Sequence, residues 1–220
     1  MHYRIGALTI SQSPRHDLLK PIIKLFPEYD IIEAGALDNM DTDNLPDGTG
    51  APYPLTTTLN NGIHVTLDHD FLAPLVQGAI YRLEAQDVDI IVLLCAGDFP
   101  DLVGNVPIVN PTDLAQKTLR AMGVHQLAVI SPITIQVPPI ENKWRGAGFQ
   151  ASIWVMPPKT TTEEQALLIN SQLKAHSDIT CIVLDYVGYP NESIITLQKL
   201  VDKPVFDLGH LALSVVSSLL

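Results

Sequence analysis

The stretch from Asp89 to Pro100, DIIVLLCAGDFP, constrains the fold of this chain more than any other. Its uninterrupted aliphatic run is typical of a strand that is buried on both faces, and the run stops abruptly at Cys95. In open α/β sheets, ligands bind at the carboxyl ends of the strands, because the loops diverge there and the following helices direct their N-termini inward. The stretch therefore predicts a central strand that carries Cys95 at a ligand-binding edge.

A similar pattern returns about 90 residues later as CIVLDYVGYP, residues 181–190. Two related elements of this kind indicate a duplicated architecture, with two similar lobes and one cleft between them. Cys181 stands at the start of its strand, at the end away from the predicted cleft. A free cysteine is among the residues most often buried, so we expect Cys181 to be a structural thiol.

Elsewhere the chain alternates short apolar strands with amphipathic helices, which predicts an α/β fold with parallel sheets and right-handed crossovers. We expect strands at 3–10, 29–33, 106–109, 126–131, 150–155 and 204–206, and helices at 17–25, 68–86, 110–122, 134–146, 161–176, 192–200 and from 208 onward. This order predicts a first lobe at 1–109, a second lobe at 110–206, and a terminal helix at 207–220 that can return to the first lobe.

Two local signals predict turns. Ser13 before Pro14 suggests a helix N-cap with proline at the first helical position, which would leave backbone N–H groups facing an anion, and the alternative is an ordinary βα loop. Asn61-Gly62 lies within an alternating segment at 59–67, which predicts a β-hairpin with a type I′ turn.

Residues 34–58 lack periodicity and are rich in aspartate, proline and glycine. A segment of this length within a compact domain usually acts as a lid or is mobile. The spacing of Asp38, Asp41, Asp43 and Asp47 lacks the order of an EF-hand and a terminal glutamate, so we expect no metal site here.

Composition excludes several classes of function. The 24 acidic residues outnumber the 13 basic ones, and the formal net charge of −11 opposes attraction to a nucleic acid backbone. We find no apolar run of about 18 residues for a membrane span and no signal peptide. The 2 cysteines are far apart and do not form a disulfide framework, so we expect a reducing cytoplasm.

No phosphate-binding loop, zinc motif or serine-hydrolase elbow is present, and we expect no cofactor and no metal. A homo-oligomer stays open.

Three side chains at the predicted carboxyl edges carry chemistry. A thiolate at Cys95 can act as a nucleophile, or as a base toward an acidic C–H, and the alternative is a buried structural thiol. Asp185 can orient a partner or bind a substrate amine, and its alternative role is to accept loop or helix N–H groups. Tyr186 has a phenol that is a poor base near neutral pH unless a positive neighbour stabilises the phenolate.

The segments LTISQSPR, IVLLCAGDFP and IVLDYVGYP, and the lengths between them, resemble the AroM-like protein family over essentially the whole chain. That family is similar to the aspartate/glutamate/hydantoin racemase superfamily, in which two lobes each place one thiol against a substrate α-carbon without a cofactor. The resemblance implies that Cys95 matches the first thiol and that Tyr186 takes the position of the second. It also implies that the cleft is lined by Thr9, Ser11, Ala96, Gly97, Asp98, Ser131, Asp185, Val187 and Gly188.

The departures from the family pattern bear on mechanism. Where AroM-like relatives are expected to carry threonine, threonine and cysteine, this chain has Ala96, Asp98 and Tyr186. Inversion needs a donor and an acceptor on opposite faces, so the loss of the second thiol argues against two-base racemisation.

Three hypotheses follow from these residues. The first is a cofactor-independent racemase, isomerase or decarboxylase type of enzyme that acts on a small carboxylate through Cys95. The second is a non-catalytic protein that binds a small anion or amino acid in a degenerate cleft. The third is a packing role for Cys95 in a protein that interacts through its acidic 38–47 loop.

Overall fold

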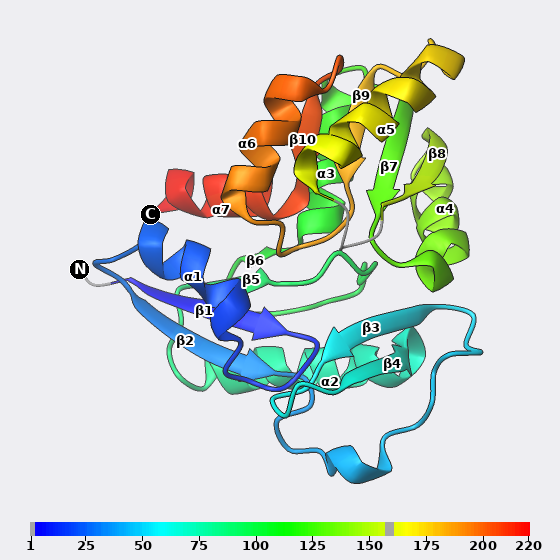
Figure 1. Ribbon diagram of the computed structural model, residues 1–220. Helices are drawn as coiled ribbons and strands as arrows, with labels where there is room; N and C mark the ends of the chain where they lie inside the picture. Colours follow the sequence, from blue (N-terminus) through cyan, green and yellow to red (C-terminus); the bar gives the residue numbers. More distant parts are fainter. Residues whose placement is uncertain (1–2, 157–160) are drawn as a thin grey trace. The chain divides into compact units, whose positions relative to one another are not determined.

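The computed structural model of the protein describes residues 3–156 and 161–220 (Figure 1). The chain divides into two compact units. Unit 1 comprises Met1–Thr112 and Ala212–Leu220, and unit 2 comprises Asp113–Leu211. Each unit is built around one parallel sheet that is flanked by helices, which confirms the predicted α/β class with two similar lobes.

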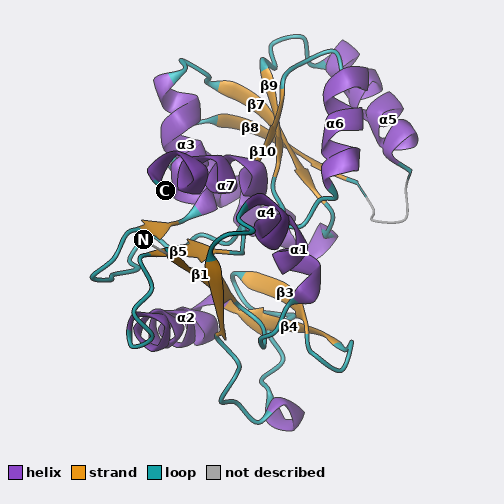
Figure 2. Ribbon diagram, turned by 90° about the vertical axis from the view of Figure 1, so that its left-hand side faces the viewer, coloured by secondary structure: helices purple, strands orange, loops and turns teal. Residues whose placement is uncertain are grey.

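Unit 1 contains sheet A, with the strand order β2-β1-β5-β6 and every pairing parallel. Helices α1 and α2 lie on opposite faces of this sheet (Figures 1 and 2). The bounds of these elements are β1 Arg4–Thr9, α1 His16–Leu25, β2 Asp30–Gly35, α2 His69–Glu84, β5 Ile90–Leu93 and β6 Ile108–Val109. The aliphatic run of β5 is fully buried next to β1, so the predicted central strand is confirmed.

The predicted hairpin exists, but its strands and turn differ from the expectation. Strands β3 (Pro54–Thr58) and β4 (His64–Asp68) pair antiparallel in a separate two-stranded sheet, so the last part of the 34–58 segment is regular. A type I′ turn needs positive φ at both central residues, and of the Asn61-Gly62 pair only Gly62 has one, at +85°. Five residues instead connect the strands, and the Asn61 side chain accepts a hydrogen bond from the Ile63 N–H at 3.0 Å.

The rest of the 34–58 segment contains one short 3₁₀ helix, η1 (Thr42–Asn44). Its acids make local hydrogen bonds: Asp41 accepts from the Asp43 N–H at 3.1 Å, and Asp47 accepts from the Thr49 N–H at 2.9 Å. Hydrogen bonds to these exposed carboxylates, first of all from the Asn44 and Thr49 side chains, lower the pKa of both aspartates. The acidic cluster therefore shapes the loop in the way that aspartates commonly do in turns.

The predicted N-cap at Ser13 is wrong. Helix α1 begins at His16, with Arg15 at the N-cap position. Ser13 instead donates to Asp38 through both its backbone N–H, at 2.6 Å, and its hydroxyl, at 2.9 Å. The anion that binds this loop is thus the carboxylate of Asp38, a residue that follows β2.

Unit 2 contains sheet C, with the strand order β10-β9-β7-β8 and every pairing parallel. Helices α5 and α6 lie side by side over one face, and their buried side chains pack on residues such as Ile130, Ile182 and Leu184 (Figure 2). The elements from Pro111 onward are α3 Pro111–Ala121, β7 Gln126–Ser131, η2 Thr134–Gln136, α4 Val137–Gly146, β8 Gln150–Val155, α5 Thr162–Ala175, β9 Cys181–Leu184, α6 Asn191–Leu200, β10 Val205–Asp207 and α7 Leu208–Leu219. Helix α7 begins in unit 2, and its part from Ala212 onward belongs to unit 1.

Helix α5 begins with the capping box that the sequence predicted. The Thr161 hydroxyl accepts from the Glu164 N–H, and the Glu164 carboxylate accepts from the Thr161 N–H at 3.0 Å. This reciprocal pair satisfies backbone donors that a helix start otherwise leaves open.

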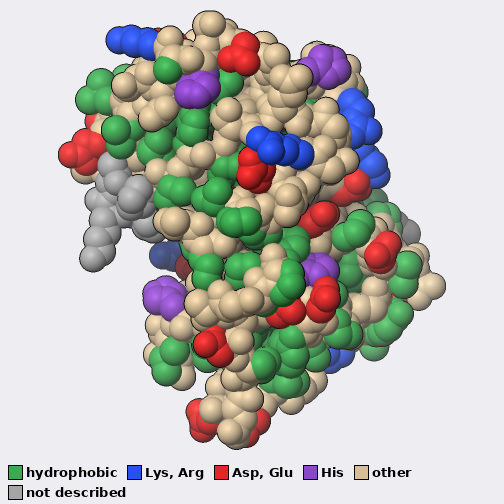
Figure 3. Space-filling model, turned by 90° about the vertical axis from the view of Figure 1, so that its right-hand side faces the viewer, with side chains coloured by type: hydrophobic (Ala, Val, Ile, Leu, Met, Phe, Trp, Pro, Cys, Tyr) green, Lys and Arg blue, Asp and Glu red, His purple; other side chains and the backbone are tan. Residues whose placement is uncertain are grey.

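Within residues 3–156 and 161–220, no helix is long and apolar enough to cross a membrane. On the face drawn in Figure 3, acidic and basic side chains are interspersed among neutral ones, and the described residues form no continuous basic surface there. The end of the chain, Ala212–Leu220, belongs to unit 1, where the Leu220 carbonyl accepts from the Tyr29 hydroxyl at 3.4 Å.

Candidate active site

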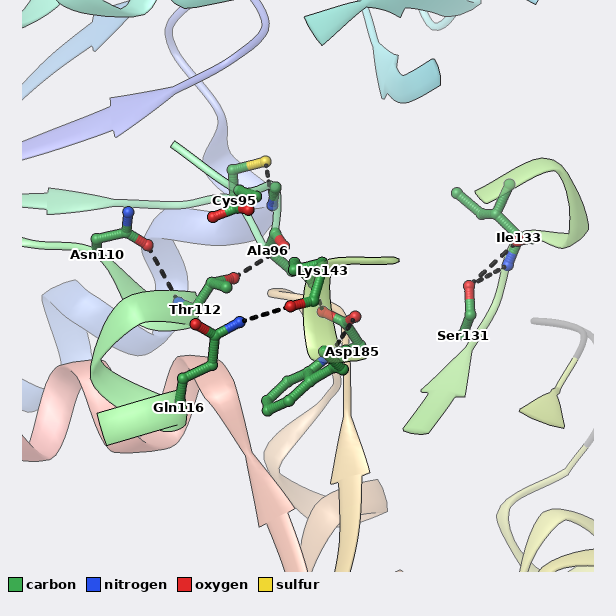
Figure 4. Close-up of polar contacts among 12 residues, drawn as sticks. Cys95, Ala96, Asn110, Thr112, Gln116, Ser131, Ile133, Lys143 and Asp185 are labelled. Atoms are coloured by element: carbon green, nitrogen blue, oxygen red, sulfur yellow. Dashed lines mark hydrogen bonds and ion pairs between the residues drawn. The ribbon is translucent and has the colours of Figure 1, made fainter. Parts of the chain in front are cut away.

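Cys95 lies just beyond the carboxyl end of β5 in unit 1. Cys95 is 8% exposed, and its sulfur accepts a hydrogen bond from the Gly97 N–H at 3.2 Å (Figure 4). The strand places the thiol at the edge where parallel sheets bind ligands, and the loop folds back so that a backbone donor meets the sulfur. Cys95 therefore lies where the sequence predicted it, at the carboxyl end of a central strand, whereas its role stays a prediction.

The loop after Cys95 is held in place from several sides. The Thr112 hydroxyl donates to the Ala96 carbonyl at 2.9 Å (Figure 4). The Asp98 N–H donates to the Tyr53 hydroxyl at 2.9 Å. A Cβ at Gly97 would lie 2.7 Å from the Phe99 ring and 3.3 Å from the Cys95 sulfur, so only glycine fits without a shift. These contacts fix the loop geometry around the thiol.

Thr9 and Ser11, which the family resemblance places at the site, are buried at the end of β1 beside β5. The Ser11 hydroxyl donates to the Thr58 carbonyl at 2.6 Å, and the Ser11 N–H donates to the Thr9 hydroxyl oxygen at 3.3 Å. Both side chains thus connect the β1 loop internally and to the β3-β4 hairpin.

An aromatic layer that the sequence did not single out supports the same loop. The His69 ring stacks against Tyr53 at 5.1 Å and lies 4.9 Å from the Phe99 ring, centroid to centroid. Among the described residues, His69 Nε2 is buried without a hydrogen-bond partner. The signal for these residues was weak because they come from three separate segments, two of which lie at the hairpin.

In unit 2, Asp185 follows directly after β9 and is buried. One carboxylate oxygen accepts from Lys143 Nζ at 2.8 Å, and the other accepts from Trp144 Nε1 at 3.0 Å. Both partners lie on α4, which is further held by the Gln116 amide donating to the Lys143 carbonyl at 3.4 Å (Figure 4). The Lys143 and Asp185 side chains are 1% and 0% exposed, so this is a buried ion pair.

The other unit 2 residues of the predicted site surround the ends of β7 and β9. Ser131 is fully buried, and its hydroxyl interacts with the backbone of Ile133 (Figure 4). Tyr186 is 38% exposed, and its ring meets Tyr189 edge to face at 5.7 Å. Gly188 has a φ of +130°, which favours glycine, and Val187 precedes it in the same loop.

Two further polar groups lie beside this edge of sheet C. Asp207 ends β10, where it pairs with Leu184 of β9, and it is 7% exposed. Its Oδ1 accepts from the His210 N–H at 2.6 Å, whereas its Oδ2 and the Tyr189 hydroxyl are buried without hydrogen-bond partners among the described residues. Sequence reasoning missed both residues, although an acid between a strand and a helix at this edge was a usable signal.

Burial affects the ionisation of three groups in unit 2. It raises the pKa of Asp207 to about 6, although the His210 and Gly209 N–H groups and the His210 charge act against the shift. Burial, and next the charge of Asp207, raise the pKa of Tyr189. Burial also raises the pKa of the Cys181 thiol to about 11. Cys181 begins β9 and is buried, which agrees with the structural thiol that we expected.

Within the described part of the chain, no group of three or more histidine, cysteine, aspartate or glutamate side chains is arranged to hold a metal ion. The ionisable groups described at these strand ends are the thiol, the carboxyl groups and the phenols.

The fold is shared with three solved structures of low sequence identity, an arylmalonate decarboxylase, a maleate isomerase and a glutamate racemase. Unliganded arylmalonate decarboxylase matches with a TM-score of 0.65 at 14% identity, covering 99% of this chain and 92% of that one. Maleate isomerase from Pseudomonas putida matches at 0.62 and 12% identity, covering 100% and 93%. Glutamate racemase from Aquifex pyrophilus matches at 0.55 and 18% identity, covering 99% and 84%.

The chain belongs to the AroM protein family, whose model matches residues 5–220. This confirms the resemblance that the three sequence segments indicated. No curated protein matches the sequence.

Proposed function

We propose that this protein is a cofactor-independent enzyme that acts on a small carboxylate through Cys95. The observation that carries the proposal is the Cys95 sulfur at the carboxyl end of β5, with the Gly97 N–H 3.2 Å away. An N–H donor at this position favours the thiolate over the neutral thiol, and the thiolate is the form that serves as a base or nucleophile. The racemase-like fold supports this reading, since an arylmalonate decarboxylase and a maleate isomerase share it.

The reaction that we propose uses one thiol. Tyr186 stands at the position that the resemblance assigns to a second cysteine, and a phenol is a poorer base than a thiolate at neutral pH unless a positive neighbour stabilises the phenolate. One thiol is sufficient for decarboxylation with protonation, for isomerisation through a covalent adduct, or for proton exchange on one face of the substrate. In this proposal Asp185 acts as a positioning residue that ties the loop after β9 to α4, because both of its oxygens already accept hydrogen bonds from Lys143 and Trp144.

The decisive experiment is proton NMR in heavy water with a panel of small chiral amino acids, hydroxy acids and malonates. Deuterium uptake or carbon dioxide release that disappears in Cys95→Ala supports the proposal. Cys181→Ala is the matched control, because it removes the other buried cysteine, from the opposite end of a strand. Turnover that survives in Cys95→Ala would overturn the role of this thiol.

A second experiment measures thiol reactivity against pH. At pH 8, Cys181 stays protonated because its pKa is raised to about 11, so fast alkylation at this pH reports on Cys95. Alkylation of Cys95 no faster than that of a free thiol would remove the support for a thiolate.

The alternative is a non-catalytic protein that binds a small anion or amino acid. It is favoured by Asp98 and Tyr186, which stand where AroM-like relatives are expected to carry a threonine and the second cysteine. Thermal stabilisation by members of the same panel without turnover would support this second function.

A further inference from the structure

The carboxyl edge of sheet C contains two buried polar atoms that lack a partner. Asp207 is 7% exposed, and neither its Oδ2 nor the Tyr189 hydroxyl has a hydrogen-bond partner among the described residues. A buried polar group without a partner costs about 1–3 kcal/mol, so folded proteins rarely leave one in place. Asp207 ends β10 and Tyr189 follows the neighbouring strand β9, so a ligand that supplies donors could satisfy both atoms.

The two residues lie beside the predicted substrate-binding loop of unit 2. Asp207 pairs with Leu184 in the β9-β10 register, and Asp185 to Tyr189 follow Leu184 directly. A Cβ at Gly209 would lie 3.4 Å from Asp207 Oδ1 and 3.5 Å from Val187, so Asp207 and Val187 flank the same glycine. The N-terminus of α7 holds only Oδ1, through the His210 N–H at 2.6 Å.

We propose that Asp207 Oδ2 and the Tyr189 hydroxyl form a subsite that binds an ammonium group of the ligand. Both oxygens can accept hydrogen bonds, and an ammonium supplies three donors and the positive charge that Oδ2 lacks. A neutral hydroxyl would supply one donor and leave the charge uncompensated. The nearby Asp185 does not compete for the cation, because Lys143 already neutralises it.

Ionisation of the pair supports the same assignment. Burial raises the pKa of Asp207 to about 6, and burial followed by the charge of Asp207 raises the pKa of Tyr189. The other titratable groups that act on the pair are Tyr186 and Asp185 from the loop after β9 and His210 from α7. An ammonium favours the charged carboxylate, so ligand binding is expected to release a proton from Asp207 near pH 6.

This inference rests on the proposed function for the small carboxylate nature of the ligand, and it adds the amino group. The probes are therefore matched pairs such as alanine with lactate and aspartate with malate, which differ in the amino group. Binding is measured by calorimetry in Cys95→Ala, so that chemistry does not interfere. We expect the amino acid of one pair to bind more tightly than its hydroxy acid.

Asp207→Asn should weaken amino acid binding about tenfold to a hundredfold, which is the usual value of a hydrogen bond to a charged group, and leave hydroxy acid binding unchanged. Tyr189→Phe should weaken it less while keeping the ring. With Asp207 intact, the affinity for the amino acid should be about tenfold lower at pH 5 than at pH 8, because Asp207 is largely protonated at pH 5. Asp202→Asn is the matched control, an exposed acid next to the same strand.

Equal losses for both members of a pair, or no loss in either variant, would overturn the subsite. The subsite would also be overturned if no amino acid binds and a water alone bridges Asp207 Oδ2 and the Tyr189 hydroxyl. The proposed function can fail separately. In that case the wild type shows no exchange or decarboxylation, while Asp207-dependent binding persists in Cys95→Ala.

Discussion

The ends of β9 and β10 each present a buried aspartate, and the two differ in how completely the protein surrounds them. Asp185 after β9 has both carboxylate oxygens bonded, to Lys143 at 2.8 Å and to Trp144 at 3.0 Å. Asp207 at the end of β10 has one oxygen bonded to the His210 N–H, and the other is buried without a partner among the described residues.

This difference separates a structural carboxylate from a candidate binding group. A buried charge is tolerated when a countercharge and hydrogen bonds satisfy it, and Asp185 meets that condition within unit 2. Asp207 does not meet it, and burial accordingly raises its pKa to about 6. A group that is costly in the free protein is a good candidate for a ligand contact, because binding then supplies the missing partner.

The largest effect is expected from breaking the satisfied pair. Lys143→Met leaves Asp185 buried beside a single indole donor, and removal of one partner of a buried pair costs about 3–5 kcal/mol. Urea unfolding at pH 7 measures this loss. The double variant Lys143→Met with Asp185→Leu should recover part of it, because no uncompensated charge remains but the Trp144 indole N–H loses its acceptor. A loss below about 1 kcal/mol in the single variant would show that Asp185 does not depend on Lys143.

Replacement of Asp207 at the end of β10 is expected to raise stability at neutral pH, whereas replacement of Lys143 lowers it. The folded state raises the pKa of Asp207 from 3.8 to about 6, so it favours the neutral acid. The associated stability is fully present below about pH 4 and is lost as the pH rises through 6, which amounts to roughly 2–3 kcal/mol. Asp207→Asn is neutral throughout and keeps an acceptor for the His210 N–H. Its free energy of unfolding relative to wild type should therefore rise by about 2 kcal/mol between pH 4 and pH 8.

The control for this pH series is Asp202→Asn, whose carboxyl is on an exposed residue just before β10. It removes the same charge, and its stability relative to wild type should stay constant over the series. A flat profile for Asp207→Asn as well would mean that Asp207 is not shifted.

The fold was predictable where local patterns decide it. Strands β7 and β8 match the expected 126–131 and 150–155, and the capping box at Thr161 marks the start of α5 correctly. In these segments, buried aliphatic runs and helix caps are properties of consecutive residues. The predicted N-cap at Ser13 was wrong because the Ser13 N–H and hydroxyl both donate to Asp38, 25 residues away, so the hydroxyl does not cap the helix.

The candidate site was predictable only in part for the same reason. Cys95 and Asp185 follow strands, so the rule about carboxyl ends located them. Their partners did not follow from the rule: Lys143 and Trp144 reach Asp185 from over 40 positions earlier, and Tyr53 reaches Asp98 from 45 positions earlier. Pairings at such distances depend on helix packing and hairpin placement, which one sequence does not encode locally.

The smallest effect compares two buried hydroxyls. The Tyr189 hydroxyl has no partner among the described residues, so Tyr189→Phe removes an unsatisfied group and should leave stability unchanged or raise it by up to about 1 kcal/mol. The Thr112 hydroxyl donates to the Ala96 carbonyl at 2.9 Å, so Thr112→Val should lower stability by about 1 kcal/mol. Parallel urea titrations at pH 7 measure both changes. Equal losses in the two variants would mean that the Tyr189 hydroxyl is satisfied in solution, and the contrast between the ends of β9 and β10 would then rest on Asp207 alone.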